Sequence, residues 1–507
     1  MKPSRASQVS GLRSILSNTN PFSLSILSGI LLSLPFFDGR LWIFAWFGFA
    51  PLFFALRGKS KGRAFLLSYF TGVIFWAGTI YWLIHVTLLG QVLLILFLSL
   101  YFGFFGLFVF ASRQAPGAIR LFFIPSLWVF LEYLRAHLFS GFGWALLGYS
   151  QYLNLPLIQI ADIFGAYGVS FLVMMVNVAF WELIIISSIK VSKCQSAKYQ
   201  ASSIRRNFSF LFPFFCLLFS LVYGFYKLYR TPKHELRTTL KISVIQGNIP
   251  QELKWDRGSQ GLILDRYAQL SQKAALEKPD LIIWPEAASP GLIGVTKDDW
   301  LLEHIFALPK ETGIPLLLGS VVRENKNYFN SALLIDRQGK IAERYDKLHL
   351  VPFGEYVPLK ELFPFLETIV PIGDFTSGDS YTLFSLSPSA LPPLSGPAGA
   401  GVKFGVLICF EDTVPELSRN FVKKGADFLV NITNDGWFKE TKAPHQHLAA
   451  SVFRAVENRV PLVRAANTGV SCFIDACGRI KAKVTGNGKD IFVPGTKTET
   501  IFLEHML

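Results

Sequence analysis

The sequence predicts a polytopic α-helical membrane bundle joined to an α/β domain that lies outside the cytoplasm. Apolar residues make up 51% of the 507 residues and charged residues 17%, and most of the apolar excess precedes residue 230. Beyond residue 240, strand-like and helix-like segments alternate, which is typical of a sheet covered by helices. We therefore expect a transmembrane domain over residues 1–230, an α/β domain over residues 240–490, and a C-terminal tail over residues 491–507.

A helix needs about 20 mostly apolar residues to cross a bilayer. About seven segments of the first half approach this requirement, namely residues 22–37, 41–56, 64–86, 91–112, 121–139, 166–189 and 208–226. The stretch 64–112 contains no Asp, Glu, Lys or Arg and is too long for one crossing, so we expect a turn near Gly90 and Gln91. The first two segments are short and are separated by Asp38 and Arg40.

The basic residues of the first half predict the orientation of the bundle. Four stretches without any Asp or Glu hold fourteen Lys and Arg residues, which equals the net charge of +14: residues 1–20, 57–63, 112–120 and 189–207. The alternate loops hold almost none. Because Lys and Arg favour cytoplasmic loops, the N-terminus is expected inside and the residues after 230 outside. This distribution argues against a nucleic-acid partner. No small-residue cleavage site follows the first apolar run, so we do not expect that run to be a cleaved signal peptide.

Four ionisable residues lie in or beside the apolar segments: Glu132, Arg135, Asp162 and Glu182. Charged groups at such positions are candidates for function. Glu132 and Arg135 could equally pair with each other at their i,i+3 spacing. The glycine- and aromatic-rich residues 140–151 read as an outward loop at the membrane interface, the depth that Trp and Tyr favour.

In the second half, apolar runs predict strands and amphipathic segments predict helices. Strands are expected at residues 240–248, 280–286, 315–322, 403–409, 427–433 and 461–466, and helices at residues 259–277, 445–458 and from Thr413 onward. Continuous apolar strands of this kind are typical of a buried sheet. Residues 385–401, rich in Pro, Gly, Ala and Ser, read as a surface loop.

Three residues at or just past the ends of strands suggest a site, because sheets often present their chemistry there. Cys409 follows an apolar run, Glu286 ends another, and Lys347 follows a shorter strand. A cysteine nucleophile needs a base to take its proton and donors to stabilise an oxyanion, roles that Glu286 and Lys347 can fill. The alternative is that Cys409 is a small buried residue and that the other two lie on the surface.

The residues after Cys409 predict a helix whose N-terminus faces the thiol. Thr413 and Glu416 have the spacing of a capping box, with Pro415 inside the first turn. The positive end of such a helix would favour the thiolate of Cys409.

Other cysteines and histidines give weaker signals. Cys472 and Cys477 could pair across a hairpin in an oxidising compartment, although small buried cysteines are common. His445 and His447 look like metal ligands, but residues two apart on a helix face different sides, so no metal is expected.

Longer motifs surround the three site residues: WPEAA at Glu286, YDKLHLVPFGEYVP at Lys347 and CFED at Cys409. They resemble the Glu-Lys-Cys motifs of the nitrilase (carbon–nitrogen hydrolase) superfamily. Together with the membrane half, QGNIPQELKWD (246–256) and NDGWF (434–438), they resemble the apolipoprotein N-acyltransferase family. The resemblance runs from the first span to about residue 485.

The resemblance implies an αββα domain on the periplasmic side of the bacterial inner membrane. It implies transfer of an acyl chain from a phospholipid, typically phosphatidylethanolamine, to the N-terminal amino group of a diacylglyceryl lipoprotein, without a cofactor. Cys409 would carry the acyl group as a thioester, Glu286 would act as base, and Lys347 would stabilise the oxyanion. Further matching positions are Glu355 and Glu411 as supporting acids, and Trp255, Asn330 and Phe410 as residues that line or order the site.

The chain departs from the family pattern at its end, where a further spanning helix is expected and a polar segment stands instead. Two alternatives to acyl transfer remain open at this point. One is a membrane-anchored amidase or nitrilase that uses water as the acceptor, and the other is a channel or scaffold whose outer domain has no chemistry.

Overall fold

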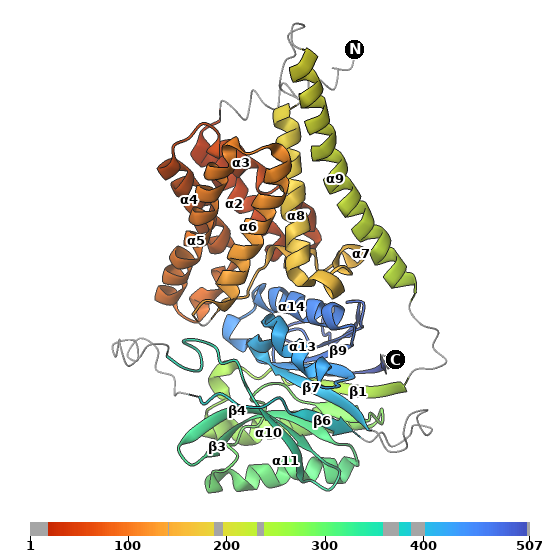
Figure 1. The fold of residues 1–507 in the computed structure, drawn as a ribbon. Coiled ribbons are helices and arrows are strands. Elements are labelled where there is room, and N and C mark those ends of the chain that lie inside the picture. The colour runs from red at the N-terminus through yellow and green to blue at the C-terminus, as the bar shows by residue number, and fades with distance from the viewer. Residues whose placement is uncertain are drawn as a thin grey trace. The chain divides into compact units, whose positions relative to one another are not determined.

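The computed structural model describes residues 19–139, 141–186, 196–230, 238–357, 375–386 and 401–503, without the side chains of residues 185–186, 196–210, 238 and 297. The chain divides into two compact units, Met1–Arg230 and Thr231–Leu507. Figure 1 shows the first unit as helices and the second as sheets with helices.

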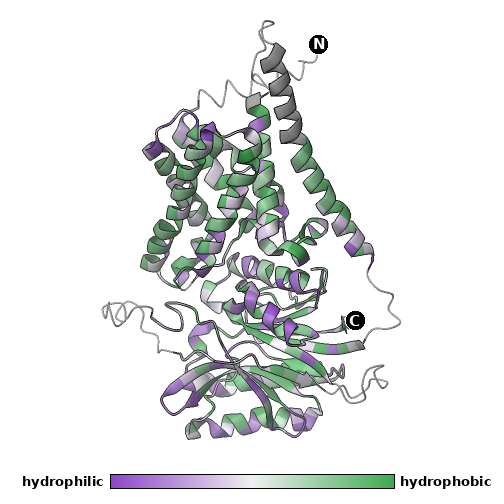
Figure 2. Cartoon of the chain, in the orientation of Figure 1, coloured by the Kyte–Doolittle hydropathy of each residue, from purple (hydrophilic) through white to green (hydrophobic). Residues whose placement is uncertain are grey.

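The first unit is built from helices throughout its described residues. They are α2 (Pro21–Phe37), α3 (Ala50–Leu56), α4 (Lys61–Thr79), α5 (Leu88–Ala111), α6 (Gly117–His137), α7 (Leu155–Ile158), α8 (Ala161–Ile186) and α9 (Ser196–Tyr229). A 3₁₀ helix, η1 (Gly39–Trp46), precedes α3, and a second, η2 (Tyr81–His85), follows α4. The apolar character of these helices is visible in Figure 2.

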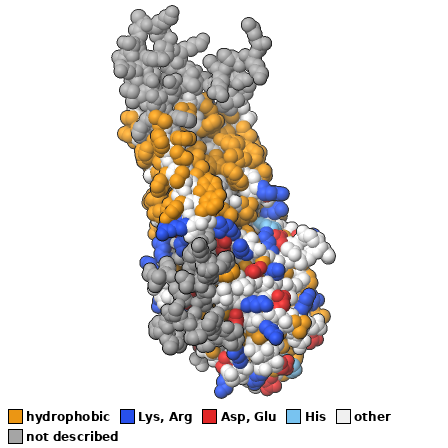
Figure 3. All heavy atoms as spheres, turned by 90° about the vertical axis from the view of Figure 1, so that its right-hand side faces the viewer, with side chains coloured by type: hydrophobic (Ala, Val, Ile, Leu, Met, Phe, Trp, Pro, Cys, Tyr) orange, Lys and Arg blue, Asp and Glu red, His pale blue; other side chains and the backbone are white. Residues whose placement is uncertain are grey.

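Five stretches of the first unit are long and apolar enough to span a membrane: Gly39–Leu56, Leu88–Gln114, Gly117–His137, Ala161–Ile184 and Leu211–Tyr229. The helix Pro21–Phe37 is apolar but shorter. Many large apolar side chains remain exposed, and Leu93, Phe215, Phe219 and Val222 are each more than half exposed. Figure 3 shows hydrophobic side chains gathered over the surface of this unit. Such a surface fits a lipid environment and predicts a polytopic membrane protein.

The turn that we expected at Gly90 and Gln91 lies earlier in the chain. Helix α4 ends at Thr79, and α5 begins at Leu88 after the 3₁₀ helix η2. Thr87 caps α5, because its hydroxyl oxygen accepts a hydrogen bond from the N–H of Gly90 at 3.2 Å. A threonine cap therefore decides where the helix starts, and the glycine lies within its first turn.

Buried charges hold the connection between α6 and α8. Glu132 accepts a hydrogen bond from the N–H of Leu147 at 2.6 Å. The guanidinium of Arg135 donates to the carbonyl oxygens of Phe142 and Trp144 at 2.6 and 2.7 Å. Residues 143–150 are accordingly buried within the unit. The two charged residues thus stabilise this loop, a role beyond the mutual pairing that their spacing suggested.

The other two ionisable candidates also form ion pairs inside the first unit. Glu182 on α8 is paired with Arg120 on α6 at 2.5 Å, and both side chains are buried. Asp162 lies 3.1 Å from Lys227 and accepts hydrogen bonds from the hydroxyl of Tyr223. These pairs join neighbouring helices and neutralise charges that would be costly in an apolar environment.

The second unit contains two six-stranded sheets. The first has the order β12-β1-β2-β3-β4-β5, with β1 (Thr238–Gln246), β2 (Leu281–Ile283), β3 (Leu316–Glu324), β4 (Asn327–Ile335), β5 (Ile341–Asp346) and β12 (Gly495–Leu503). The second has the order β11-β10-β9-β8-β7-β6, with β6 (Leu383–Leu386), β7 (Val402–Ile408), β8 (Phe428–Thr433), β9 (Leu462–Ala466), β10 (Cys472–Ile474) and β11 (Ile480–Lys483). Strands β1–β3 run parallel, as do β7–β9, and the outer strands are antiparallel.

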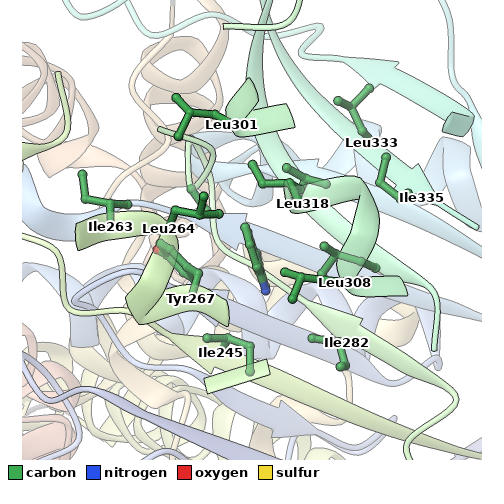
Figure 4. Packing of buried hydrophobic residues seen from close by; sticks show 14 of the residues in the cluster. Ile245, Ile263, Leu264, Tyr267, Ile282, Leu301, Leu308, Leu318, Leu333 and Ile335 are labelled. Atoms are coloured by element: carbon green, nitrogen blue, oxygen red, sulfur yellow. The ribbon is translucent and has the colours of Figure 1, made fainter. Parts of the chain in front are cut away.

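Helices cover the outer face of each sheet. Helices α10 (Gln260–Ala275) and α11 (Asp299–Thr312) lie beside the first sheet, and α13 (Pro415–Lys423) and α14 (Ala443–Asn458) pack on the second (Figure 1). The two sheets contact each other through β1 with β9 and β4 with β7. The core under α10 and α11 contains Tyr267, Ile282, Leu308 and Leu318, which Figure 4 shows packed together. The expected αββα sandwich is confirmed.

One expected boundary is wrong. Residues 491–507 were expected as a tail, but β12 pairs antiparallel with β1 from Gly495 to Leu503 and forms an edge of the first sheet. The polar residues that suggested a tail are half-buried or buried in this strand, and the hydroxyl groups of Thr498 and Ser243 lie 2.7 Å apart between β12 and β1. Most of the expected surface loop 385–401 lies outside the described residues.

Replacing Arg135 by Met should loosen the loop that follows α6. The loop would lose two hydrogen bonds from a charged donor, each contributing on the order of 1.5–3 kcal/mol. We expect faster amide hydrogen exchange in residues 141–151 and a lower melting temperature. Arg40→Met is the control, because the ion pair of Arg40 with Asp38 is exposed and should contribute little. Equal exchange in the two variants would contradict the role of Arg135.

Candidate active site

The three residues that the sequence pointed to meet in one place in the second unit. Glu286 lies in the turn after β2, Lys347 directly follows β5, and Cys409 directly follows β7. The Nζ atom of Lys347 is 3.6 Å from Oε1 of Glu286. The charges of both residues act on the thiol of Cys409. Glu286 and Lys347 are buried, and Cys409 is partly buried. The two sheets thus contribute together to one site.

A glycine on the neighbouring strand allows the turn of Glu286 to pack closely. The carbonyl of Pro285 accepts a hydrogen bond from the N–H of Gly319 on β3 at 3.1 Å. A Cβ atom at position 319 would lie 2.6 Å from both the Cα of Glu286 and the carbonyl oxygen of Pro285. A glycine in a strand often marks such a close approach of two backbones.

Asn330 and Glu355 complete the charged centre. Lys347 donates to Oε1 of Glu355 at 2.9 Å. The amide of Asn330, on β4, donates to Glu286 at 2.8 Å and to Glu355 at 2.7 Å. The N–H of Val351 donates to the other oxygen of Glu355 at 2.7 Å. One lysine and one amide therefore hold two carboxylates at fixed positions.

The electrostatics keep the lysine charged and the thiol protonated. Burial lowers the pKa of Lys347, but the charges of Glu355, Glu286 and Cys409 more than offset this, so its pKa is raised. Desolvation and the charge of Glu286 raise the pKa of Cys409 well above its usual value, and Lys347 opposes this only in part. A resting thiol of this kind must give up its proton to a base as it reacts.

The expected helix N-terminus at Cys409 is wrong in its details. Residues 409–413 form a 3₁₀ turn, and α13 begins only at Pro415 with Val414 as an N-cap that lacks a side-chain hydrogen bond. The hydroxyl of Thr413 instead donates to the carbonyl of Phe410 at 2.8 Å. The intervening turn separates the thiol from the helix.

Glu411 links the two sheets from a fully buried position. Its Oε2 accepts from the N–H of Ile408 at 2.7 Å. Its Oε1 accepts from the hydroxyl of Tyr345 at 2.9 Å and from the N–H groups of Leu348 and His349 at 2.8 and 3.0 Å. Burial raises the pKa of Glu411 to about 7 against the effect of these donors. Because all four partners are donors, the carboxylate fixes the residues around Cys409 and Lys347 relative to each other.

The two expected aromatic residues lie in different surroundings. Phe410 is buried, and its ring stacks on His349 with a centroid separation of 6.0 Å. Trp255 is 54% exposed. What connects Trp255 to the site is its neighbour in the sequence, Lys254, which contacts Glu286.

Lys254 is a site residue that the sequence reasoning missed. It is buried, and its ammonium donates to the carbonyl oxygen of Glu286 at 3.1 Å. Burial lowers the pKa of Lys254 to about 8, while the charges of Glu286 and Cys409 oppose this. Its position inside the motif QGNIPQELKWD was a signal, but nothing in the sequence distinguishes it from a surface lysine.

The arrangement provides a nucleophile, a base and a fixed positive charge within one cluster of polar groups, of which Glu286 and Lys347 are buried and Cys409 is partly buried. Glu286 can take a proton from Cys409, and Lys347 can stabilise negative charge that develops on a carbonyl oxygen attacked by the sulfur. These are the elements of acyl transfer through a covalent enzyme intermediate.

The pH dependence of thiol alkylation tests this electrostatic account. Alkylation of Cys409 by iodoacetamide should be slow at pH 7 and should rise with pH. Glu286→Gln removes a negative charge that raises the pKa of the thiol, so the rise should move to lower pH. Lys347→Met should move it to higher pH, because the opposing positive charge is lost. Peptide mass spectrometry measures alkylation at Cys409 alone. Shifts of the alkylation profile in the opposite directions would show that Glu286 and Lys347 do not act on the thiol in this way.

Comparison with known proteins supports the same chemistry. Residues 28–179 match the model of the apolipoprotein N-acyltransferase N-terminal domain, and residues 241–499 match the carbon-nitrogen hydrolase model. The chain is 40% identical to the apolipoprotein N-acyltransferase of Geobacter metallireducens, over 91% of this chain and 86% of the relative. It is 30% identical to that of Haemophilus ducreyi, over 94% of this chain and 92% of the relative.

Among solved structures, an amidase from Nesterenkonia sp. AN1 covers 52% of this chain and 90% of its own, with 19% identity and a TM-score of 0.38. The relatives from Geobacter and Haemophilus match both units of this chain along most of their own length. The chain belongs to the apolipoprotein N-acyltransferase family.

Proposed function

We propose that this chain transfers an acyl chain from a phospholipid to the N-terminal amino group of a lipoprotein through a thioester on Cys409. The expected donor is phosphatidylethanolamine, and the expected acceptor is a diacylglyceryl lipoprotein. The observation that carries the proposal is the meeting of the partly buried Cys409 with the buried side chains of Glu286 and Lys347. The relatives named apolipoprotein N-acyltransferase support the transferase over the hydrolase interpretation.

The membrane half supports a lipid substrate and a membrane location. Its apolar surface and five candidate spans suit a protein that meets both substrates in the bilayer. Each buried CH₂ group of an acyl chain contributes about 0.8 kcal/mol to membrane binding, so a lipid donor will not readily leave the bilayer for a soluble enzyme. We infer a bacterial inner-membrane protein with a periplasmic catalytic unit, as the distribution of basic residues predicts. The expected count of about seven spans adds α2 and α4 to the five candidate spans.

In the first step, Glu286 takes the proton of the Cys409 thiol while the sulfur attacks the ester carbonyl of the phospholipid. Lys347 stabilises the negative charge on the carbonyl oxygen. The tetrahedral intermediate then collapses, the carbon–oxygen ester bond breaks, and Glu286 returns the proton to the leaving alkoxide. The products of this step are a lysophospholipid and an acyl thioester on Cys409.

In the second step, the neutral α-amino group of the lipoprotein attacks the thioester. Glu286 accepts a proton from the attacking nitrogen, and Lys347 again stabilises the oxyanion. The carbon–sulfur bond breaks, and the sulfur recovers the proton from Glu286. The pKa of an α-amino group is about 8. Near neutral pH a fraction of the acceptor amine is therefore already neutral without help from the protein.

The other site residues have supporting roles in this scheme. Glu355 and Asn330 hold Lys347 and Glu286 in place through the hydrogen bonds described above. Glu411 fixes the turn that carries the nucleophile. We infer that Phe410 and Trp255 line the entry to the thiol.

Replacing Cys409 by Ala should abolish the acyl-enzyme. Purified wild-type protein given phosphatidylethanolamine should gain the mass of one acyl chain on Cys409, and the variant should gain none, because it has no sulfur to acylate. Glu286→Gln should leave almost no adduct, since the thiol would lose the base proposed to take its proton. Substantial turnover by the Cys409 variant would contradict the mechanism.

The acceptor is tested by adding a diacylated lipopeptide to the acylated protein. Transfer should release the enzyme and yield N-acylated peptide. Free fatty acid without N-acylated peptide would contradict the transferase function and favour the hydrolase alternative.

Lys254→Met should slow acyl-enzyme formation about tenfold, since a hydrogen bond from a charged group contributes on the order of 1.5 kcal/mol. The variant would leave the carbonyl of Glu286 without this buried donor. Lys241→Met is the matched control, because Lys241 also donates to a backbone carbonyl, that of Glu277, but at an exposed position. Equal rates of acyl-enzyme formation in the two variants would show that Lys254 has no role in the site.

A further inference from the structure

The backbone of the nucleophile has an unusual conformation that other residues must maintain. Cys409 has a φ of +52°, in the left-handed region that residues other than glycine rarely occupy. Its carbonyl oxygen accepts a hydrogen bond from the amide of Asn431 at 3.1 Å and lies 3.3 Å from Nε2 of His447. The same amide donates to the carbonyl of Leu407 at 3.1 Å. Asn431 therefore holds the chain on both sides of the sharp turn at the end of β7.

A cluster of four buried charged residues lies behind this turn. Asp412, Asp435, His447 and Arg464 are each at most 1% exposed. Nε2 of His447 is 2.9 Å from a carboxylate oxygen of Asp412, and Nδ1 is 2.9 Å from one of Asp435. Arg464 contacts the other oxygens of the same two carboxylates at 3.0 and 3.2 Å. His447 and Arg464 therefore each contact both Asp412 and Asp435.

The geometry determines the charge of His447. A carboxylate oxygen can only accept a hydrogen bond, so both ring nitrogens must donate and the imidazole carries two protons. Burial and the charge of Arg464 lower the pKa of His447, but Asp412 and Asp435 more than offset them and raise it to about 9. Two positive and two negative charges then balance, which buried charges require.

Arg464 also fixes the orientation of Asn431. Its Nη1 donates to Oδ1 of Asn431 at 2.5 Å. The reversed amide would place an NH₂ group against the guanidinium, so the amide nitrogen must point to the carbonyl oxygens of Leu407 and Cys409. The orientation of the hydrogen-bond donor that holds the nucleophile thus depends on the charged cluster.

We propose that Asn431 and His447 are positioning residues of the nucleophile, held in place by the charged cluster of Asp412, Asp435 and Arg464. They fix the carbonyl of Cys409 and thereby aim its sulfur at the carbonyl carbon of the acyl donor. Neither residue needs to touch the substrate. This inference rests on the proposed role of Cys409 as the acyl carrier, and no motif in the sequence marked either residue for this task.

The test measures the rate of acyl-enzyme formation in single turnover and the KM for phospholipid. Asn431→Leu removes both hydrogen bonds at similar side-chain volume. His447→Leu removes the charge and the donor at Nε2 that faces the carbonyl of Cys409. Displacing a reacting group by about 1 Å can cost on the order of a hundredfold in rate. We expect acylation to slow about tenfold to a hundredfold in both variants, with KM for phospholipid changed by less than about twofold.

Asn458→Leu is the matched control for lost stability. Asn458 lies at the end of α14 and donates to Ser418 and to the carbonyl of Arg454, away from the turn at Cys409. It should lower the melting temperature while leaving the acylation rate intact. Unchanged acylation in both test variants, a change confined to KM, or failure of both to fold would overturn the positioning role. Wild-type protein that forms no acyl-enzyme would instead overturn the proposed function itself.

Discussion

The active site depends on the balance of charge around Lys347. A lysine that is 1% exposed would lose its proton to burial unless carboxylates stood close by. Glu355 and Glu286 supply that charge, and Asn330 ties the two carboxylates together. The same balance keeps Glu286 beside the thiol. A positive charge that is fixed before the reaction begins costs no reorganisation when the oxyanion forms.

This balance requires both sheets of the sandwich. Glu286, Asn330 and Lys347 come from strands of the first sheet or their ends, whereas Cys409 follows a strand of the second. Glu411 bonds to residues of both parts and so fixes the distance between them. The packing of the two sheets is therefore what brings the nucleophile and the charged groups of the proposed site together.

Buried charges recur in the helical unit with a different task. Arg135 and Glu132 bond to backbone groups of a loop, and Arg120 pairs with Glu182 between two helices. In an apolar environment unpaired backbone and charged groups are costly, so such contacts decide local structure strongly. Charges that looked like candidates for chemistry in the sequence thus stabilise structure here.

The sequence by itself determined the division into an apolar helical half and an α/β half and the six parallel strands, and it singled out the three residues that we propose for the centre of the site. These features are readable because periodicity, charge distribution and long motifs are properties of contiguous residues. It did not reveal β12 as an edge strand, the antiparallel strand β4, or the start of α13 at Pro415. Tertiary structure alone decided the environment of the thiol, since the charges that raise its pKa come from distant segments. Lys254, Asn431 and His447 gained their roles in the same way, because a hydrogen bond between residues far apart in the chain exists only once the two sheets have packed.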